Sequence, residues 1–162
     1  MDSKQLNIIN IDKIKELTPE VYNNEMNTSR PFFILHSLLY KKGENIISTQ
    51  YNINQTELDV LASLYYSSKE NFSLTPTELY EIMLFSSGGM TKVLKKLEEK
   101  EYIRRIENSK DKRSKLVQIT SLGKEITEKA LKDIVTFEAN YFSKLTNNEQ
   151  DQLKTLLYKI LD

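Results

Sequence analysis

Residues 74–123 read LTPTELYEIMLFSSGGMTKVLKKLEEKEYIRRIENSKDKRSKLVQITSLG, and their first part carries a clear helix-start signal. Thr75 and Glu78 have the spacing of a capping box, in which each side chain bonds the other residue's backbone N–H. Pro76 suits the first position of a helix because its missing N–H would have no partner there. The pattern predicts a short helix that ends near Met83.

A second helical pattern follows a break at residues 85–89 and ends near Lys100. Its apolar residues recur at helical spacing, which predicts one buried face: Met90, Val93, Leu94 and Leu97. The period then changes, because residues 102–107 and 115–120 are rich in aromatic or β-branched side chains and too short for helices. They flank the polar loop 108–114, so we expect a β-hairpin with a charged tip.

The order helix, break, helix and two-stranded hairpin is that of a winged helix-turn-helix. In this fold the second helix lies in the major groove of DNA, and the hairpin loop reaches an adjoining minor groove or the phosphate backbone.

The remaining segments are predicted to be helical. Helix starts are indicated at Pro31 and at the capping boxes of Asn54 and Thr146, and a long helical pattern begins at Ser121. The apolar spacing in these segments is typical of helices that pack on a core. The fold class expected for the 162 residues is therefore mainly α with a small antiparallel β-hairpin wing, with outer helices on both sides of the wing module.

Composition excludes several functions. Hydrophobic residues make up 39% and charged residues 28%, with no apolar run long enough for a membrane span and no secretory signal at the start, so we expect a cytoplasmic protein. There is no cysteine and one histidine, which argues against metal sites and cysteine chemistry. Carboxylate pairs such as Glu98 and Glu99 have no nucleophile or base nearby. We expect no enzyme, no cofactor and no metal.

The charge is unevenly placed along a chain that sums to zero. Residues 86–115 hold ten basic and five acidic residues, which makes this segment net positive on an acidic remainder. Such asymmetry indicates a surface for a polyanion. The plain alternative is a solvated helix face, and charge alone does not decide between the two.

Candidate DNA contacts are drawn from the helix start, the polar helix face and the hairpin tip. A helix N-terminus offers free N–H groups to a phosphate, two glycines there permit close backbone approach, and basic side chains reach base edges or phosphates. The glycines could equally serve only the turn between the helices, and the lysines could be ordinary solvent-exposed residues. The candidates are Ser86, Ser87, Gly88, Thr91, Lys92, Lys95, Lys96, Lys110, Lys112 and Arg113.

Asp111 is the candidate brace of the hairpin tip. Placed two residues before Arg113, its carboxylate could accept hydrogen bonds from that guanidinium and aim it outward, and arginine is preferred in narrow minor grooves. The alternative is a surface ion pair of little energetic value.

Residues 74–123 also resemble the winged helix-turn-helix of the MarR family of bacterial transcription regulators, and SSGGMTKVLKKLE resembles its PecS-like branch. The similarity includes the helix end Leu97–Lys100, the wing motif Asp111–Ser114 and the closing element Ile119–Gly123. Glu101 departs from the family pattern, which usually has glycine there.

The resemblance implies a homodimeric regulator, most often a repressor. Residues 1–53 and 121–162 would form dimerisation helices, and residues 54–120 would form the module that reads half of a palindromic operator. Apolar residues outside the module agree with dimerisation, although they could instead form a monomer core.

Family members commonly release DNA when a small, often aromatic, ligand binds near the dimerisation helices. Phe33, His36 and Tyr40 share a helical face near that expected cleft. Their pattern favours the alternative of core residues with a satisfied imidazole. Urate-responsive relatives resemble one another in having a tryptophan in an early helix, and this chain has none, which argues against urate. A second class of function stays open, since a winged helix can also serve as a protein-interaction module that uses its basic surface to bind an acidic partner.

Overall fold

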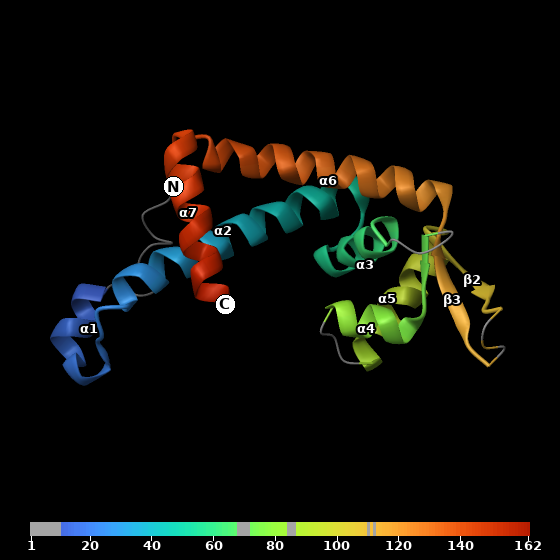
Figure 1. Cartoon of the computed structure of the whole chain (residues 1–162), viewed down its shortest axis with the longest axis horizontal. Helices are drawn as coiled ribbons and strands as arrows, with labels where there is room; N and C mark the ends of the chain where they lie inside the picture. Colours follow the sequence, from blue (N-terminus) through green and yellow to red (C-terminus); the bar gives the residue numbers. More distant parts are fainter. Residues whose placement is uncertain (1–10, 68–71, 84–86, 110, 112) are drawn as a thin grey trace. The chain divides into compact units, whose positions relative to one another are not determined.

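The computed structural model describes residues 11–67, 72–83, 87–109, 111 and 113–162. The chain divides into two compact units, residues 1–42 and 43–162, and each is described by itself. The elements follow one another as helices, a two-residue strand, two helices, a hairpin and two final helices (Figure 1). Their bounds are α1 Ile11–Leu17, η2 Pro19–Val21, α2 Met26–Tyr51, α3 Gln55–Tyr65, β1 Ser73–Leu74, α4 Pro76–Met83, α5 Ser87–Glu99, β2 Ile103–Glu107, β3 Lys115–Ile119, α6 Ser121–Phe142 and α7 Asn147–Leu161.

The first unit contains α1, η2 and the N-terminal part of α2. The prediction that a helix begins at Pro31 is wrong, because α2 begins at Met26 and holds Pro31 in its interior. The first turn of the helix lies before Pro31. In it, the Glu25 carbonyl accepts hydrogen bonds from the N–H groups of Thr28 and Ser29 at 3.0 and 2.9 Å. Proline inside a helix removes one intrahelical bond, so sequence patterns favour a helix start at such a residue.

The predicted capping boxes in the second unit are confirmed. Thr75 and Glu78 bond each other's backbone N–H groups at the start of α4, with distances of 3.2 and 2.8 Å. Reciprocal boxes are likewise formed by Asn54 with Glu57 and by Thr146 with Glu149. Because each box satisfies N–H groups that have no partner within the helix, these helix starts are determined by local chemistry.

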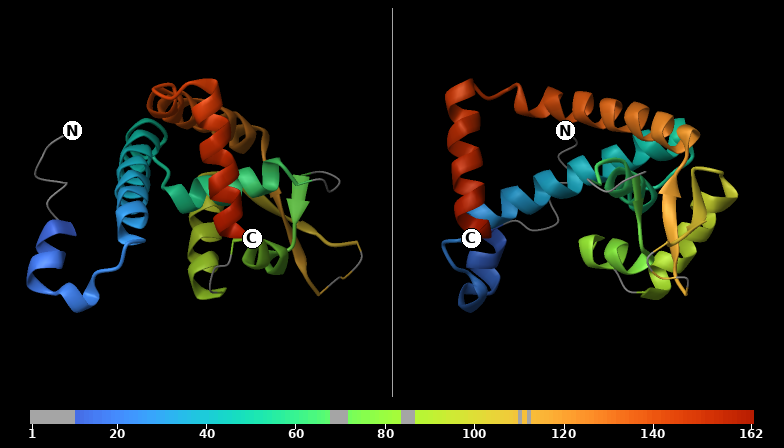
Figure 2. Two further views of the ribbon diagram at one scale, coloured as in Figure 1. Left: turned by 60° about the vertical axis from the view of Figure 1, so that its left-hand side comes forward. Right: turned by 45° about the vertical axis from the view of Figure 1, so that its right-hand side comes forward.

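The hairpin is part of a three-stranded antiparallel sheet with the order β1-β3-β2. Strand β3 pairs with β2 in the register Ile103 with Ile119 and Glu107 with Lys115, as the hairpin prediction requires. Sequence reasoning missed β1, whose two residues pair with Gln118 and Val117. A two-residue strand has no readable alternation. Its pairing fastens the segment before α4 to the sheet, and β3 leads directly into α6 (Figure 2).

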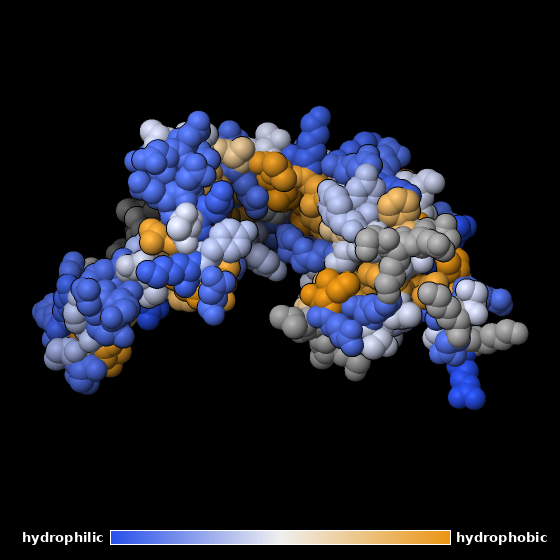
Figure 3. All heavy atoms as spheres, viewed as in Figure 1, coloured by the Kyte–Doolittle hydropathy of each residue, from blue (hydrophilic) through white to orange (hydrophobic). Residues whose placement is uncertain are grey.

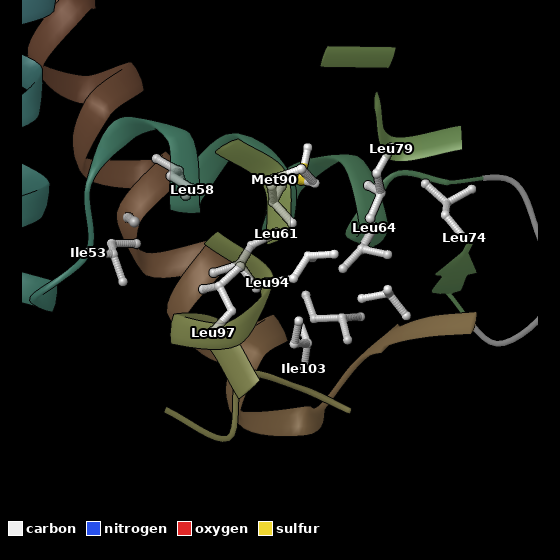
Figure 4. Packing of buried hydrophobic residues seen from close by; sticks show 14 of the residues in the cluster. Ile53, Leu58, Leu61, Leu64, Leu74, Leu79, Met90, Leu94, Leu97 and Ile103 are labelled. Carbon is white, nitrogen blue, oxygen red and sulfur yellow. The ribbon is translucent and has the colours of Figure 1, made fainter. Parts of the chain in front are cut away.

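One hydrophobic core holds the wing module together. It is built from α3, α4, α5 and the inner face of the sheet (Figure 4), and its fully buried side chains include Leu58, Leu61, Leu64, Leu79, Met90, Leu94, Leu97, Ile103 and Val117. Three of the four residues in the apolar stripe predicted for α5 are at most 1% exposed, and Val93 is half-buried. The core therefore fixes which face of α5 points outward.

Helix α6 packs on α3 and on the C-terminal end of α2. Tyr51 donates a hydrogen bond to Asp133 Oδ2 at 2.7 Å, and Tyr65 donates one to Glu128 Oε1 at 2.5 Å. The hydroxyl of Tyr51 is held in its protonated form by the Asp133 carboxylate, with smaller effects of burial and charge, which raises its pKa to about 12. The helix ends at Phe142, three residues before the Leu145 included in its predicted pattern.

Candidate nucleic-acid interface

The polar face of α5 presents four of the candidate residues to solvent. Met90 and Leu94 anchor the opposite face in the core, while Thr91, Lys92, Lys95 and Lys96 are exposed. Lys95 Nζ lies 3.8 Å from the Glu99 carboxylate one turn further along, with both side chains mostly in solvent. Such an exposed pair is weak, so it leaves the lysine available for another anion.

The N-terminus of α5 lies where the sequence predicts a phosphate-binding turn. The helix begins at Ser87, which puts Gly88 in its first turn. Ser86, the residue that would occupy the cap position, lies outside the described residues, so the choice between Ser86 and Ser87 as N-cap stays a prediction. The first N–H groups of a helix have no partner inside it, which is the property a phosphate contact uses.

The C-terminus of α5 ends in a Schellman motif. The N–H of Tyr102 donates to the Leu97 carbonyl at 3.0 Å, and the N–H of Glu101 donates to the Glu98 carbonyl at 3.0 Å. Glu101 adopts the left-handed conformation that this motif demands, with φ of 59°. The turn into the wing therefore has the conformation that glycine favours, although this chain has glutamate at that position.

The hairpin tip is shaped by Asp111. Its Oδ1 accepts a hydrogen bond from the backbone N–H of Arg113 at 3.0 Å, whereas the sequence predicts a bond to the guanidinium. The Asp111 carbonyl also accepts from the N–H of Ser114 at 3.1 Å. The carboxylate thus stabilises the turn itself, and Arg113 is exposed beyond it. Hydrophilic side chains project at the lower right of Figure 3, where Figure 1 draws the hairpin. Lys110 and Lys112 lie outside the described residues.

Three basic residues of the positive segment are bound to other parts of the second unit. Lys100 Nζ lies 2.9 Å from Glu57 Oε2, Arg105 Nε lies 3.7 Å from Glu98 Oε2, and Arg104 Nε donates to Gln118 Oε1 at 2.7 Å. Carboxylates therefore pair with Lys100 and Arg105, whereas the exposed Arg104 bonds a neutral amide, which leaves its charge unneutralised. Sequence reasoning identified Glu57 only as a cap, although its position on the apolar face of α3, four residues before Leu61, signals a buried partner.

The residues expected near a ligand cleft lie in the first unit. His36 and Tyr40 stack with ring centroids 6.1 Å apart, and Phe33 packs edge-on against Phe32 at 5.5 Å. All three side chains are exposed in the single chain, and both interpretations, ligand contacts and core residues, stay predictions. In the described part of the chain, no cluster of three His, Asp or Glu side chains could hold a metal ion. No described helix combines the length and apolarity needed to cross a bilayer.

An exposed basic helix face, anchored by its apolar side and followed by a hairpin with an arginine at its tip, defines a DNA-binding protein of the winged helix-turn-helix class. The MarR family profile matches residues 53–115. The uncharacterized HTH-type transcriptional regulator YkoM of Bacillus subtilis is 35% identical over 69% of this chain and 70% of its own length. The chain belongs to the MarR family of transcription regulators.

Two further likenesses agree with this assignment. The HTH-type transcriptional regulator PecS of Dickeya dadantii is 23% identical over 76% of this chain and 74% of its own length. The crystal structure of Sco3205, a MarR family regulator from Streptomyces coelicolor in complex with DNA, covers 87% of this chain and 88% of its own with a TM-score of 0.75 and 19% identity. At 19% identity, the similarity to Sco3205 shows a shared fold.

Proposed function

We propose that two copies of this chain bind one palindromic operator in the cytoplasm and repress transcription. Each copy would place α5 in a major groove and the β2–β3 hairpin in the adjoining minor groove, with the two half-sites about one helical turn, ~34–36 Å, apart. The residues proposed to touch DNA are those predicted from the sequence: Ser86, Ser87, Gly88, Thr91, Lys92, Lys95, Lys96, Lys110, Lys112 and Arg113.

The observation that carries this proposal is the orientation of α5. Burial of Met90, Leu94 and Leu97 leaves only one face of the helix for solvent, and that face holds Thr91 and three lysines. Side chains from a helix face of this kind reach base edges in a major groove, and lysines also bind phosphates. The Sco3205 structure supports the assignment because a protein of this fold was crystallised in complex with DNA.

The proposed dimer is supported by α7. None of its residues is buried in the single chain, although its sequence is amphipathic. Leu156 is 58% exposed, Ile160 75% and Leu161 79%. An apolar helix face of this kind is stable in water when a second surface covers it, and a second copy supplies an identical face.

The proposal includes release from DNA by a small organic ligand. A redox signal through cysteine is impossible in a chain without cysteine, and one histidine gives poor metal ligation. The exposed rings of Phe33, His36 and Tyr40 on α2 are the candidate contacts for an aromatic compound.

The decisive experiment selects duplexes from a random DNA pool and then measures affinity for the winning sequence. We expect enrichment of an inverted repeat and a steep fall of affinity with salt, because phosphate contacts release counterions. Enrichment of no sequence above scrambled competitor would overturn the proposal and favour a protein-interaction module.

Replacement of Arg113 by alanine tests the wing. We expect Arg113→Ala to weaken operator binding by about tenfold or more, since a lost base or minor-groove contact costs roughly 1–3 kcal/mol. Arg104→Ala is the matched control, because it removes the same charge from the same hairpin at its base, where Arg104 bonds Gln118. Equal effects of the two substitutions in fluorescence anisotropy would contradict the assignment of Arg113 to a DNA contact.

A further inference from the structure

Glu57 is a buried carboxylate at the meeting point of three elements. It is 2% exposed and lies on α3, where it completes the capping box with Asn54. Its Oε2 accepts from the Asn54 N–H at 3.2 Å and from Lys100 Nζ at 2.9 Å. Lys100 follows α5 directly, so the ion pair joins the start of α3 to the end of the helix that faces DNA.

The ammonium of Lys100 also reaches the corner between α2 and α3. Its Nζ donates to the carbonyl of Asn52 at 2.7 Å, and Asn52 itself has a left-handed backbone with φ of 53°. One side chain therefore connects the end of α2, the cap of α3 and the end of α5. The core clamps α5 along its apolar face, but apolar contacts are non-directional and allow small rotations and slides. Charged hydrogen bonds with these short distances restrict such movements.

A buried ion pair adds little net stability to a fold. The Glu57 side chain is 3% exposed and that of Lys100 27%, so the carboxylate loses most of its contact with water. That loss offsets much of the attraction within the pair, and apolar residues of the same size often stabilise a protein equally well. Such a pair can instead fix the relative position of the two elements that it joins, because its hydrogen bonds are directional. Here the defined position is that of the C-terminal end of α5 relative to the α2–α3 corner.

We propose that Glu57 and Lys100 are positioning residues for DNA binding, which hold α5 at the orientation that its major-groove contacts require. The proposal rests on the proposed function, since it assumes that α5 reads DNA. Neither side chain is expected to touch DNA, because Glu57 is buried and the Lys100 ammonium bonds Glu57 and Asn52.

The two residues carry opposite charges, which separates positioning from simple electrostatics. If only the net charge mattered, Glu57→Gln would strengthen binding to a polyanion and Lys100→Met would weaken it. If the pair positions α5, both substitutions weaken binding to the selected operator. A glutamine side chain can still complete a capping box, so Glu57→Gln tests the ion pair without removing the cap.

The experiment measures operator affinity, affinity for a scrambled duplex, salt slope and thermal unfolding for the unmutated protein, Glu57→Gln, Lys100→Met and the double variant. Affinities are taken at a temperature where each protein is folded. Lys100→Gln, which keeps a donor for the Asn52 carbonyl, serves as a second neutral variant if Lys100→Met does not fold. Lys129→Met removes the same charge from an exposed pair with Glu125 on α6 and is the matched control.

We expect each single variant to lose operator affinity by roughly tenfold, the scale of an energetic coupling through a packed network. Affinity for scrambled DNA and the salt slope should stay near those of Lys129→Met, and the double variant should lose no more than one single variant. A lost phosphate contact would instead lower the salt slope by about one and affect both duplexes equally.

Two results would overturn the positioning role. One is operator affinity of folded Glu57→Gln that equals or exceeds the unmutated value. The other is a loss of operator affinity that, in every variant, is fully explained by the fraction of unfolded protein. Failure of the proposed function is a separate result, because it would show as absence of any preferred duplex for the unmutated protein before a variant is tested.

Discussion

Glu101 adopts a left-handed backbone conformation that is unfavourable for residues other than glycine. Its φ of 59° completes the Schellman motif at the end of α5, and its carbonyl accepts a hydrogen bond from Thr120 Oγ1 at 2.8 Å. A side chain other than that of glycine costs roughly 1–2 kcal/mol in this conformation. The neighbouring bonds are strong enough to keep the turn in place despite that cost.

We therefore expect Glu101→Gly to raise the free energy of unfolding by about 1 kcal/mol, because the strain is relieved while glycine loses some extra entropy on folding. Urea unfolding followed by circular dichroism measures the change. Glu99→Gly, two residues earlier in α5, is the control and should lower stability by about 1 kcal/mol. A loss of stability in Glu101→Gly would contradict the account of strain.

Gly123 has no space for a side chain. A Cβ added there would lie 2.1 Å from the Tyr102 carbonyl oxygen, since the first turn of α6 passes directly against the start of the wing. Backbone atoms cannot step aside as a flexible side chain does. We expect Gly123→Ala to lower the free energy of unfolding by roughly 3 kcal/mol.

Gly43→Ala is the matched control for that substitution. The added Cβ would lie 3.2 Å from Ile134 Cδ1, the end of a flexible side chain, and alanine favours the helix. Its urea midpoint should stay near that of the unmutated protein. Equal destabilisation by the two substitutions would show that the contact with the Tyr102 carbonyl has no special weight.

At the scale of the element, α6 is tied to its neighbours by tyrosine–carboxylate pairs. Tyr51 has its pKa raised from 10.0 to about 12, first by its hydrogen bond to Asp133 and then by burial and by the charge of that carboxylate. The folded state thus favours the protonated phenol. The resulting stability is fully present below pH 10 and is lost as pH rises towards 12.

We expect Asp133→Asn to lose less stability than the unmutated protein over that alkaline window. The measurement compares urea midpoints of both proteins just below pH 10 and near pH 12, where the tyrosine titrates. Tyr65 shifts in the same direction through Glu128 and contributes equally in both proteins. Parallel losses in the two proteins would contradict the role of the Tyr51–Asp133 bond.

At the scale of the whole molecule, the proposed dimer would cover the exposed apolar face of α7. Leu156 and Ile160 lie one turn apart on the exposed apolar face. We expect replacement of both by lysine to produce monomers in analytical ultracentrifugation and to weaken operator binding, because one copy reads only one half-site. Thr155→Lys adds a charge beside this face and should leave a dimer. A protein that is monomeric before substitution would contradict the proposal.

The helices of the second unit, the two wing strands and the outward face of α5 could be predicted from the sequence, whereas α1 was not predicted. The sequence signals were capping boxes at Asn54, Thr75 and Thr146, the apolar stripe of α5, and two short stretches of aromatic and β-branched residues around a polar loop. Each depends on residues close together in the chain, so local chemistry determines these elements. The sequence did not predict the start of α2 correctly. Proline is rare inside a helix and common at its first position, so Pro31 indicates the start of a helix that in fact begins at Met26.

Tertiary structure decided what happens between residues far apart in the chain. The pairing of β1 with β3, the burial of Glu57 against Lys100 and the close passage of Gly123 by Tyr102 each join segments that sequence spacing does not relate. The same packing separates lysines that stay in solvent on α5 from the lysine that is bound by an internal carboxylate. Charge can be counted along a sequence, but its availability to DNA depends on the three-dimensional neighbours of each group, because a paired and buried charge no longer acts on a distant anion.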